Sequence, residues 1–162
     1  MAADPLRVRF TMLRGMTMGR PAPVLPAWLQ VGEALPDLPA RAYALARRQF
    51  AAEVLLAELP ATVRGAALIC VTPADLFLEQ RPFVFGASMP TRGVAMVSTA
   101  RLAGVGARLH KVARHELGHL AGLPDCDGDC LMTPAASVEE IDRRRWELCP
   151  RCATQLAALP VR

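Results

Sequence analysis

Two histidines and a glutamate near the centre of the chain have the spacing of a metal-dependent hydrolytic site. The segment runs His115-Glu116-Leu117-Gly118-His119. Because residues four positions apart stand one above the other on an α-helix, His115 and His119 can bind the same ion. Glu116 lies about 100° around that helix from His115, so its carboxylate can reach a water on the ion without binding the ion itself. The spacing therefore predicts a zinc site with Glu116 as the general base.

The residues after the second histidine predict the third metal ligand. Gly122 permits a left-handed turn out of the helix, and Pro124 prevents the helix from resuming. Asp125 follows where the chain turns back, and a carboxylate oxygen is an accepted zinc ligand. Two imidazoles and one carboxylate leave a fourth position for water, which is typical of a catalytic zinc site. Asp127 is a rival ligand, although the spacing from Gly122 favours Asp125.

The acids of this loop also resemble a calcium-binding loop, but the pattern does not fit. An EF-hand loop needs a glycine at its sixth position and a bidentate glutamate at its twelfth. Counted from Asp125, those positions hold Cys130 and Ala136. The loop is therefore assigned to zinc.

Four cysteines form a second candidate metal site. Cys126 and Cys130 directly follow Asp125, and Cys149 and Cys152 lie near the end of the chain. Four thiolates suffice for a closed, tetrahedral structural zinc site, which would attach the loop of the third catalytic ligand to the C-terminal segment. Disulfides are the alternative, but five cysteines is an odd count. The fifth, Cys70, lies in an apolar segment and is expected to be a small core residue.

The elements around these residues predict an α+β fold. An active-site helix is expected from about Val105 to Gly122, because apolar residues recur at three- and four-residue steps. These are Leu109, Ala113, Leu117 and Leu120. A second, amphipathic helix is expected from Ala40 to Leu59, ending at Pro60. Ser137 has the character of an N-cap for a last helix that runs toward Trp146 and should deliver Cys149 and Cys152.

Strands are expected where short apolar or alternating runs lie between turn residues. The candidates are Leu6 to Met12, Ala66 to Thr72, Phe83 to Phe85 and Val94 to Ser98. The stretch from Pro21 to Pro39 contains five prolines and is expected to be a loop with turns. Together these elements predict a small twisted mixed β-sheet with one backing helix and one active-site helix.

Length and composition indicate one globular domain. The chain has 162 residues, 52% of them hydrophobic, and a formal net charge of +4 with Lys111 as its single lysine. We divide this single catalytic domain, residues 1–162, into an upper part to about residue 122 and a short lower part, 123–162, organised by the structural zinc. The first ten residues lack the apolar core of a signal peptide, and no apolar run is long enough to cross a membrane. We expect a cytoplasmic protein. Thiols stay reduced in that compartment, which favours a zinc site over disulfides.

These residues together resemble the archaemetzincins, a family of metzincin zinc metallopeptidases. The family pattern is HExxHxxGxxH followed by a cysteine, then a second cysteine near a methionine, then a distal CxxC. Met132 occupies the methionine position here. The resemblance extends from about residue 39 to residue 152 and includes these upstream segments: Arg48-Gln49-Phe50, Ala74-Asp75-Leu76-Phe77, Phe83-Val84-Phe85-Gly86, Ser98 and Arg101-Leu102.

The resemblance implies a metzincin-like fold, two zinc ions and a peptide or protein substrate. One ion would be catalytic, with Glu116 as general base and acid, and one structural, while Met132 would lie beneath the catalytic metal. Metzincins bind extended peptide along an edge strand above the metal, and residues 93–98 are the candidate here. Neither a membrane partner nor a nucleic acid is expected, and the protein is expected to be a monomer.

The chain departs from the family pattern twice, in one loop. Asp125 replaces the third histidine, and the first cysteine pair is separated by three residues where the family has four. A carboxylate lowers the charge of the metal centre by one, so we expect weaker polarisation of water by the ion, with altered but not abolished activity. Some metzincins steady the oxyanion with a tyrosine, but the single tyrosine here, Tyr43, lies far upstream.

Three alternatives come from other functional classes. The first is a zinc-ribbon module that binds nucleic acid through the cysteines and arginines, although the cysteine pairs lack interleaved basic and aromatic residues. The second is a non-haem iron oxygenase with two histidines and one carboxylate, which would not need Glu116. The third is a catalytically silent or self-inhibited zinc protein whose cleft is blocked.

Overall fold

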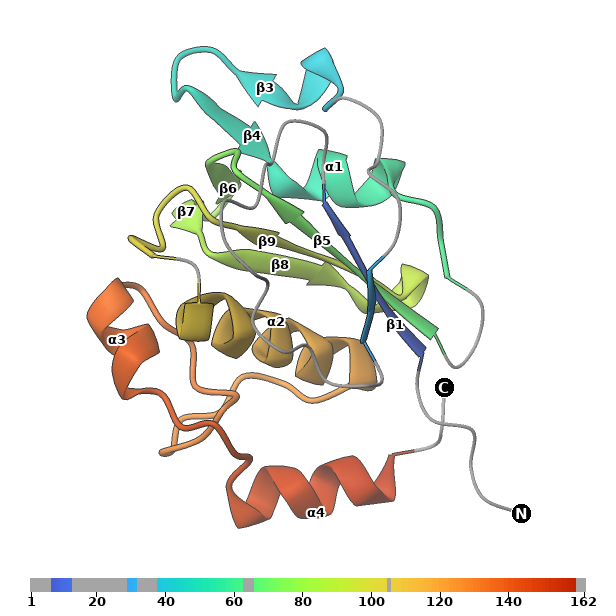
Figure 1. Cartoon of the computed structure of the whole chain (residues 1–162), viewed down its shortest axis with the longest axis vertical. Coiled ribbons are helices and arrows are strands. Elements are labelled where there is room, and N and C mark those ends of the chain that lie inside the picture. The colour runs from blue at the N-terminus through green and yellow to red at the C-terminus, as the bar shows by residue number, and fades with distance from the viewer. Residues whose placement is uncertain (1–6, 13–28, 32–37, 63–65, 105, 160–162) are drawn as a thin grey trace.

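A mixed β-sheet is the central element of the fold (Figure 1). This computed structural model describes residues 7–12, 29–31, 38–62, 66–104 and 106–159. In these ranges the sheet has five strands in the order β2-β1-β5-β9-β8, which are Leu29–Val31, Arg7–Met12, Ala66–Thr72, Val94–Ser98 and Gly86–Met89. β1 runs parallel to β2 and β5, β5 runs parallel to β9, and β8 runs antiparallel to β9. The predicted mixed sheet is confirmed, as are the strands at the start of the chain and at 66–72.

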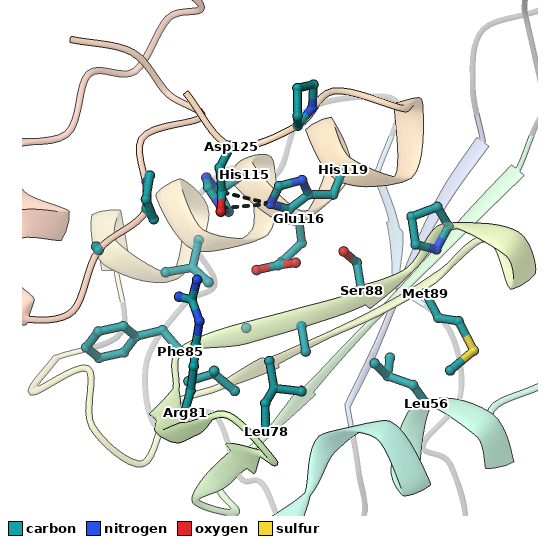
Figure 2. A pocket seen from close by; sticks show the side chains of 18 of the residues that line it. Leu56, Leu78, Arg81, Phe85, Ser88, Met89, His115, Glu116, His119 and Asp125 are labelled. Carbon is teal, nitrogen blue, oxygen red and sulfur yellow. Dashed lines mark hydrogen bonds and ion pairs between the residues drawn. The ribbon is translucent and has the colours of Figure 1, made fainter. Parts of the chain in front are cut away.

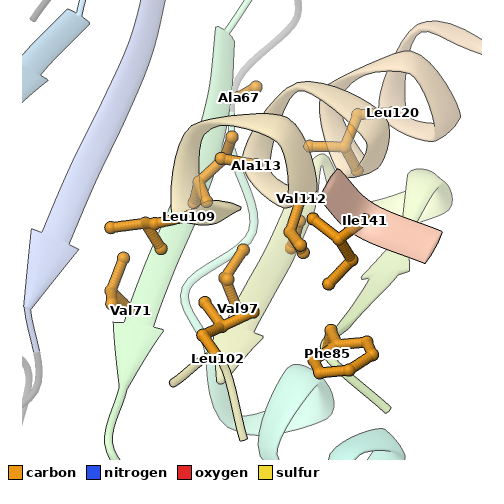
Figure 3. Packing of buried hydrophobic residues seen from close by; sticks show 12 residues of the cluster. Ala67, Val71, Phe85, Val97, Leu102, Leu109, Val112, Ala113, Leu120 and Ile141 are labelled. Carbon is orange, nitrogen blue, oxygen red and sulfur yellow. The ribbon is translucent and has the colours of Figure 1, made fainter. Parts of the chain in front are cut away.

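Helices α1 (Ala52–Glu58) and α2 (Gly106–Ala121) pack on opposite faces of this sheet (Figures 1 and 3). Side chains alternate between the two faces of a strand, and β5 follows this rule. Ile69 and Val71 pack with α2, whereas Leu68 and Cys70 pack with α1. The stripe predicted for α2 faces the sheet: Leu109, Ala113 and Leu120 are buried, and Leu117 packs against the same cluster. The active-site helix and the core position of Cys70 are therefore as predicted.

The long helix predicted for residues 40–59 is wrong. The segment forms a short 3-10 helix (Ala40–Ala42), strands β3 (Tyr43–Ala44) and β4 (Gln49–Ala51), and only then α1. Arg48, with a φ of 57°, turns the chain between the two strands. β4 then pairs with β6 (Leu76–Leu78) inside a second sheet of order β3-β4-β6-β7 in the described ranges. Pairing with a distant strand here overrides local helix propensity.

One polar side chain fixes this second sheet. Gln49 is 5% exposed, and its amide donates hydrogen bonds to Asp75 Oδ2 at 3.1 Å and to the Pro82 carbonyl at 2.9 Å. Pro82 belongs to β7 (Arg81–Val84), which pairs antiparallel with β6. Gln49 thus joins β4 to the hairpin that leads into β8.

The strand predicted at Val94–Ser98 is confirmed as β9, but the edge position predicted for residues 93–98 is wrong. β9 lies between β5 and β8, and all five of its residues are buried. An apolar strand with both faces covered belongs inside a sheet, because hydrogen-bonding partners on both sides satisfy its backbone. The edge position belongs to β8, which contacts α2.

The C-terminal segment contains two short helices where one was predicted. Ser137 caps α3 (Val138–Arg143) by accepting a hydrogen bond from the Glu140 amide at 3.3 Å, so the predicted N-cap is confirmed. α3 nevertheless ends before Trp146. A separate helix, α4 (Pro150–Ala158), begins with Pro150, a residue preorganised for the first helical position. Consequently α4, and not α3, carries Cys152.

Two other predictions concern parts of the chain that are only partly described. Most of the predicted proline-rich loop, residues 21–39, lies outside the described residues, and its described portion contains β2. Among the helices of the described residues, none has the length and apolar character to cross a membrane.

Candidate metal centre

The three residues predicted to share an ion lie together at the C-terminal end of α2 (Figure 2). The Nε2 atoms of His115 and His119 are 3.1 Å apart. Asp125 Oδ1 lies 3.5 Å from Nε2 of His115 and 3.3 Å from Nε2 of His119. Gly122, with a φ of 103°, makes the left-handed turn that returns the chain to the helix end. The loop geometry expected from Gly122 is therefore present.

When both rings are neutral, they present unprotonated nitrogens to one another. Nδ1 of His115 lies 3.1 Å from the Leu131 carbonyl, and Nδ1 of His119 lies 2.9 Å from the Leu123 carbonyl. A carbonyl only accepts, so each Nδ1 must carry the ring proton and donate it. In a neutral ring Nε2 then holds a lone pair, and two lone pairs 3.1 Å apart cannot form a hydrogen bond. A cation bound by both nitrogens would make this contact favourable.

The distances fit a zinc ion. Ligand atoms at about 2.0–2.1 Å from a tetrahedral zinc lie roughly 3.3 Å from each other. The three observed separations are 3.1, 3.3 and 3.5 Å. Burial lowers the pKa of His115 to about 4, with the Arg144 charge as a second cause, so this ring is neutral at pH 7 and available to a metal. Asp127 instead pairs with Arg151 and so is not the third member of this group.

Glu116 lies next to the three candidate ligands without joining them (Figure 2). Its side chain is buried, and this burial raises the pKa of its carboxyl to about 7. Ser88 on β8 forms a hydrogen bond with the carboxyl group. Gly86, also on β8, leaves room for it, since a Cβ at Gly86 would lie 2.5 Å from Oε1 of Glu116. Both contacts hold the carboxyl group in the cleft beside the candidate ligands.

The candidate ligands line a cleft of about 790 Å³ between α2, β8 and the loop after Met132. Apolar side chains from several elements cover much of its wall: Leu56, Leu78, Phe83, Phe85, Met89, Val112 and Pro134. Arg81 and Arg144 also line it. Sequence reasoning did not single out Arg144, because it stands in a run of three arginines and only the fold shows that it is the buried one. Tyr43 does not line this cleft and packs on Phe50 instead.

The four cysteines predicted to bind a second metal also converge. Their sulfur atoms lie within 4.8 Å of one another, and those of Cys126 and Cys149 are 3.9 Å apart. Four sulfurs at about 2.3 Å from one zinc ion are separated by roughly 3.8 Å, which is close to the 3.9 Å between Cys126 and Cys149. All five cysteines of the chain are free thiols, so the disulfide alternative is not realised in this structure.

Hydrogen bonds to sulfur show how the cysteine group is held. The Sγ of Cys130 accepts from the backbone amides of Met132 and Cys149 at 3.4 and 3.2 Å. The Sγ of Cys126 accepts from the Gly128 amide at 3.4 Å and from the Arg151 guanidinium at 3.3 Å. Such donors stabilise thiolates, which are the form of cysteine that binds metal.

Met132 packs directly against the active-site helix. It is completely buried, and its Sδ occupies the space that a Cβ at Gly118 would need. Gly118 lies between the two histidines in sequence. The methionine therefore lies against the turn of α2 that carries the candidate ligands.

Comparisons with known proteins point to one peptidase family. The model of peptidase family M54 matches residues 61–158. The chain is 35% identical to the archaemetzincin of Aeropyrum pernix over 94% of this chain and 87% of that protein. It is 34% identical to the archaemetzincin of Nanoarchaeum equitans over 74% of this chain and 69% of that protein.

Solved structures have the same fold. The crystal structure of archaemetzincin from Methanopyrus kandleri matches with a TM-score of 0.76 and 24% identity, covering 94% of each chain. The zinc-dependent peptidase from Methanocorpusculum labreanum matches with a TM-score of 0.74 and 25% identity, covering 92% of this chain and 99% of the other. The chain therefore belongs to peptidase family M54, the family of the archaemetzincins, and is a zinc metallopeptidase.

Proposed function

We propose that this chain hydrolyses peptide bonds at a zinc ion bound by His115, His119 and Asp125, with Glu116 as the group that moves the proton. One observation carries the proposal: two ring nitrogens, which cannot hydrogen-bond to each other while both rings are neutral, meet a carboxylate oxygen at zinc-ligand spacing. These three residues would hold the ion, and water from the cleft would complete its ligands.

The chemistry divides between the ion and the chain. A zinc ion at this position supplies Lewis-acid polarisation of the scissile carbonyl and of a water molecule. Glu116 accepts a proton from the attacking water at a carboxylate oxygen and then donates it to the leaving amine. Ser88 and the space at Gly86 hold that carboxyl group in place, so the proton transfer needs little rearrangement of the side chain.

Asp125 makes this centre differ from one with three histidines. Its carboxylate neutralises one charge of the dication, so the centre polarises the scissile carbonyl less strongly. Sites with two histidines and one carboxylate nevertheless hydrolyse peptides in other zinc enzymes. We therefore propose an active enzyme and not a silent one.

We also propose a second, structural zinc ion bound by the four cysteines. It would fix the loop of Asp125 to α4, because Cys126 and Cys130 lie on the loop and Cys152 on the helix. In this proposal residues 1–162 form a single catalytic domain whose lower part, 123–162, is organised by the metal.

The test uses the purified full chain with a library of peptides. We expect about two zinc ions per chain, cleavage that a chelator abolishes and added zinc restores, and a fall in kcat of at least about 1000-fold for Glu116→Gln. The matched control is Glu147→Gln, which alters an exposed glutamate and should preserve both activity and zinc content. Unchanged cleavage by Glu116→Gln at normal zinc content would refute the assignment of Glu116.

A further inference from the structure

A buried arginine without a partner lies in the wall of the catalytic cleft. Arg144 follows α3, is 8% exposed and lines the cleft with His115, Glu116 and Asp125. Its Nε and Nη1 atoms are fully enclosed and, among the described residues, have no hydrogen-bond partner. The structure therefore holds a guanidinium group beside the proposed metal site with its donors unused.

This arrangement is unfavourable for the free protein. A buried charge without a partner is destabilising, so buried arginines normally bind a carboxylate or carbonyl group. Other arginines of the chain show the normal arrangement: Arg101 binds Asp75 through two hydrogen bonds, and Arg108 binds Asp142 in the same way. Arg144 differs because none of the acids near it, Glu116 and Asp125 of the proposed centre and Glu140 of α3, forms a hydrogen bond with it in the described residues.

The charges of the proposed centre cancel without Arg144, and the remaining acid near it, Glu140, accepts a hydrogen bond from the Ala136 amide instead. A zinc dication, two neutral imidazoles and the carboxylates of Asp125 and Glu116 sum to zero. The guanidinium of Arg144 then adds one positive charge to a cleft whose wall is largely apolar. Arg81, an exposed residue whose side chain extends from β7 into the same cleft, adds another (Figure 2). An anionic group of the substrate would neutralise part of this positive charge.

We propose that Arg144 binds the side-chain carboxylate of an aspartate or glutamate beside the scissile bond, so that this peptidase prefers acidic peptides. The planar guanidinium is suited to a carboxylate, and the apolar wall around it strengthens a charge-assisted hydrogen bond. This inference rests on the proposed function, since it assumes that peptide substrate occupies the cleft.

Paired peptides test the preference. Each pair differs only by Asp against Asn, or Glu against Gln, at one position on either side of the cleaved bond. We expect kcat/KM for the acidic member to be about 10- to 100-fold higher at one position. In Arg144→Met this ratio should fall to about one, and Arg144→Lys should recover part of it. Arg143→Met, an exposed neighbour on α3, is the matched control and should retain the wild-type ratio.

A binding measurement distinguishes a failure of this inference from a failure of the proposed function. Fluorescence anisotropy with zinc-loaded Glu116→Gln should show tighter binding of the acidic member by about 10-fold or more, and this difference should vanish when Arg144→Met is added. If wild-type protein cleaves no peptide but the binding difference holds, the proposed hydrolysis fails and the role of Arg144 stands. A wild-type ratio near one at every position, or a ratio that survives in Arg144→Met, overturns the role of Arg144.

Discussion

The Cα of Gly86 lies so close to Glu116 that a Cβ on it would be 2.5 Å from Oε1 and 2.9 Å from Cγ of the glutamate. Gly86 begins the edge strand β8, and Glu116 projects from α2 toward it. The absence of a side chain at this position allows the strand to lie against the carboxyl group. One glycine thus helps to set where the proposed proton-transfer group stands.

Gly86→Ala should therefore reduce catalysis more than stability. The new methyl group displaces the Glu116 carboxyl group, and small displacements of a reacting group can lower rates by about 10- to 100-fold. Steady-state kinetics should show a fall in kcat/KM of that size, while zinc content remains unchanged. Gly106→Ala is the control, since nothing lies within 4 Å of a Cβ there. Equal activity of the two variants would contradict this role of Gly86.

Gly118→Ala should destabilise the protein although alanine is the better helix former. Alanine gains about 1 kcal/mol in helix propensity, but here its Cβ would meet the buried Sδ of Met132. Overpacking of this kind costs about 1–3 kcal/mol, so we expect a lower free energy of unfolding in urea titrations. Adding Met132→Ala should make the glycine substitution less harmful than it is alone. Additive effects of the two changes would argue against the contact.

Removal of one cysteine ligand should release one zinc ion. Cys130→Ser replaces a thiolate that accepts two backbone hydrogen bonds, so we expect zinc content to fall from about two to about one per chain. The melting temperature should fall by about 10 °C or more, because metal binding contributes to folding. Cys70→Ala, a change in the core away from the cluster, is the matched control and should retain both ions. Full zinc content in Cys130→Ser would exclude this cluster as a metal site.

Asp75→Asn should reduce stability in a pH-dependent way. Hydrogen bonds from Arg101 hold the pKa of the Asp75 carboxyl below its usual value, so its stabilisation is present above the unfolded-state pKa, about 3.9. This stabilisation is lost as pH falls through the lower folded-state pKa. Urea titrations should show a difference of about 1 kcal/mol or less between wild type and variant near pH 7, because solvent screens this pair, and the difference should shrink below about pH 4. The exposed Glu79→Gln should show little change, and a constant difference across pH would count against the ion pair.

The parts of the fold that sequence reasoning predicted correctly are those with local causes. α2 was predicted because its apolar period, the turn at Gly122 and the break at Pro124 lie within one stretch of chain. The spacing of His115 and His119 on that helix, and the return of Asp125, follow from the same local geometry.

The parts that were missed depend on distant partners. β4 exists because Phe50 pairs with Leu76, and the alanine-rich residues around it have good helix propensity when considered alone. Arg144 was missed for a similar reason, since its burial and its lack of a hydrogen-bond partner among the described residues arise only in the folded chain. The edge position of β8 likewise depends on the order of strands, which periodicity does not encode.

Both carbonyl groups that fix the histidine tautomers come from the loop that the cysteines organise: Leu123 lies just before Cys126, and Leu131 lies directly after Cys130. Any shift of this loop would therefore also move the two acceptors that decide which nitrogen of each ring carries its proton. The proposed structural zinc would thereby help to hold both rings ready for the proposed catalytic ion.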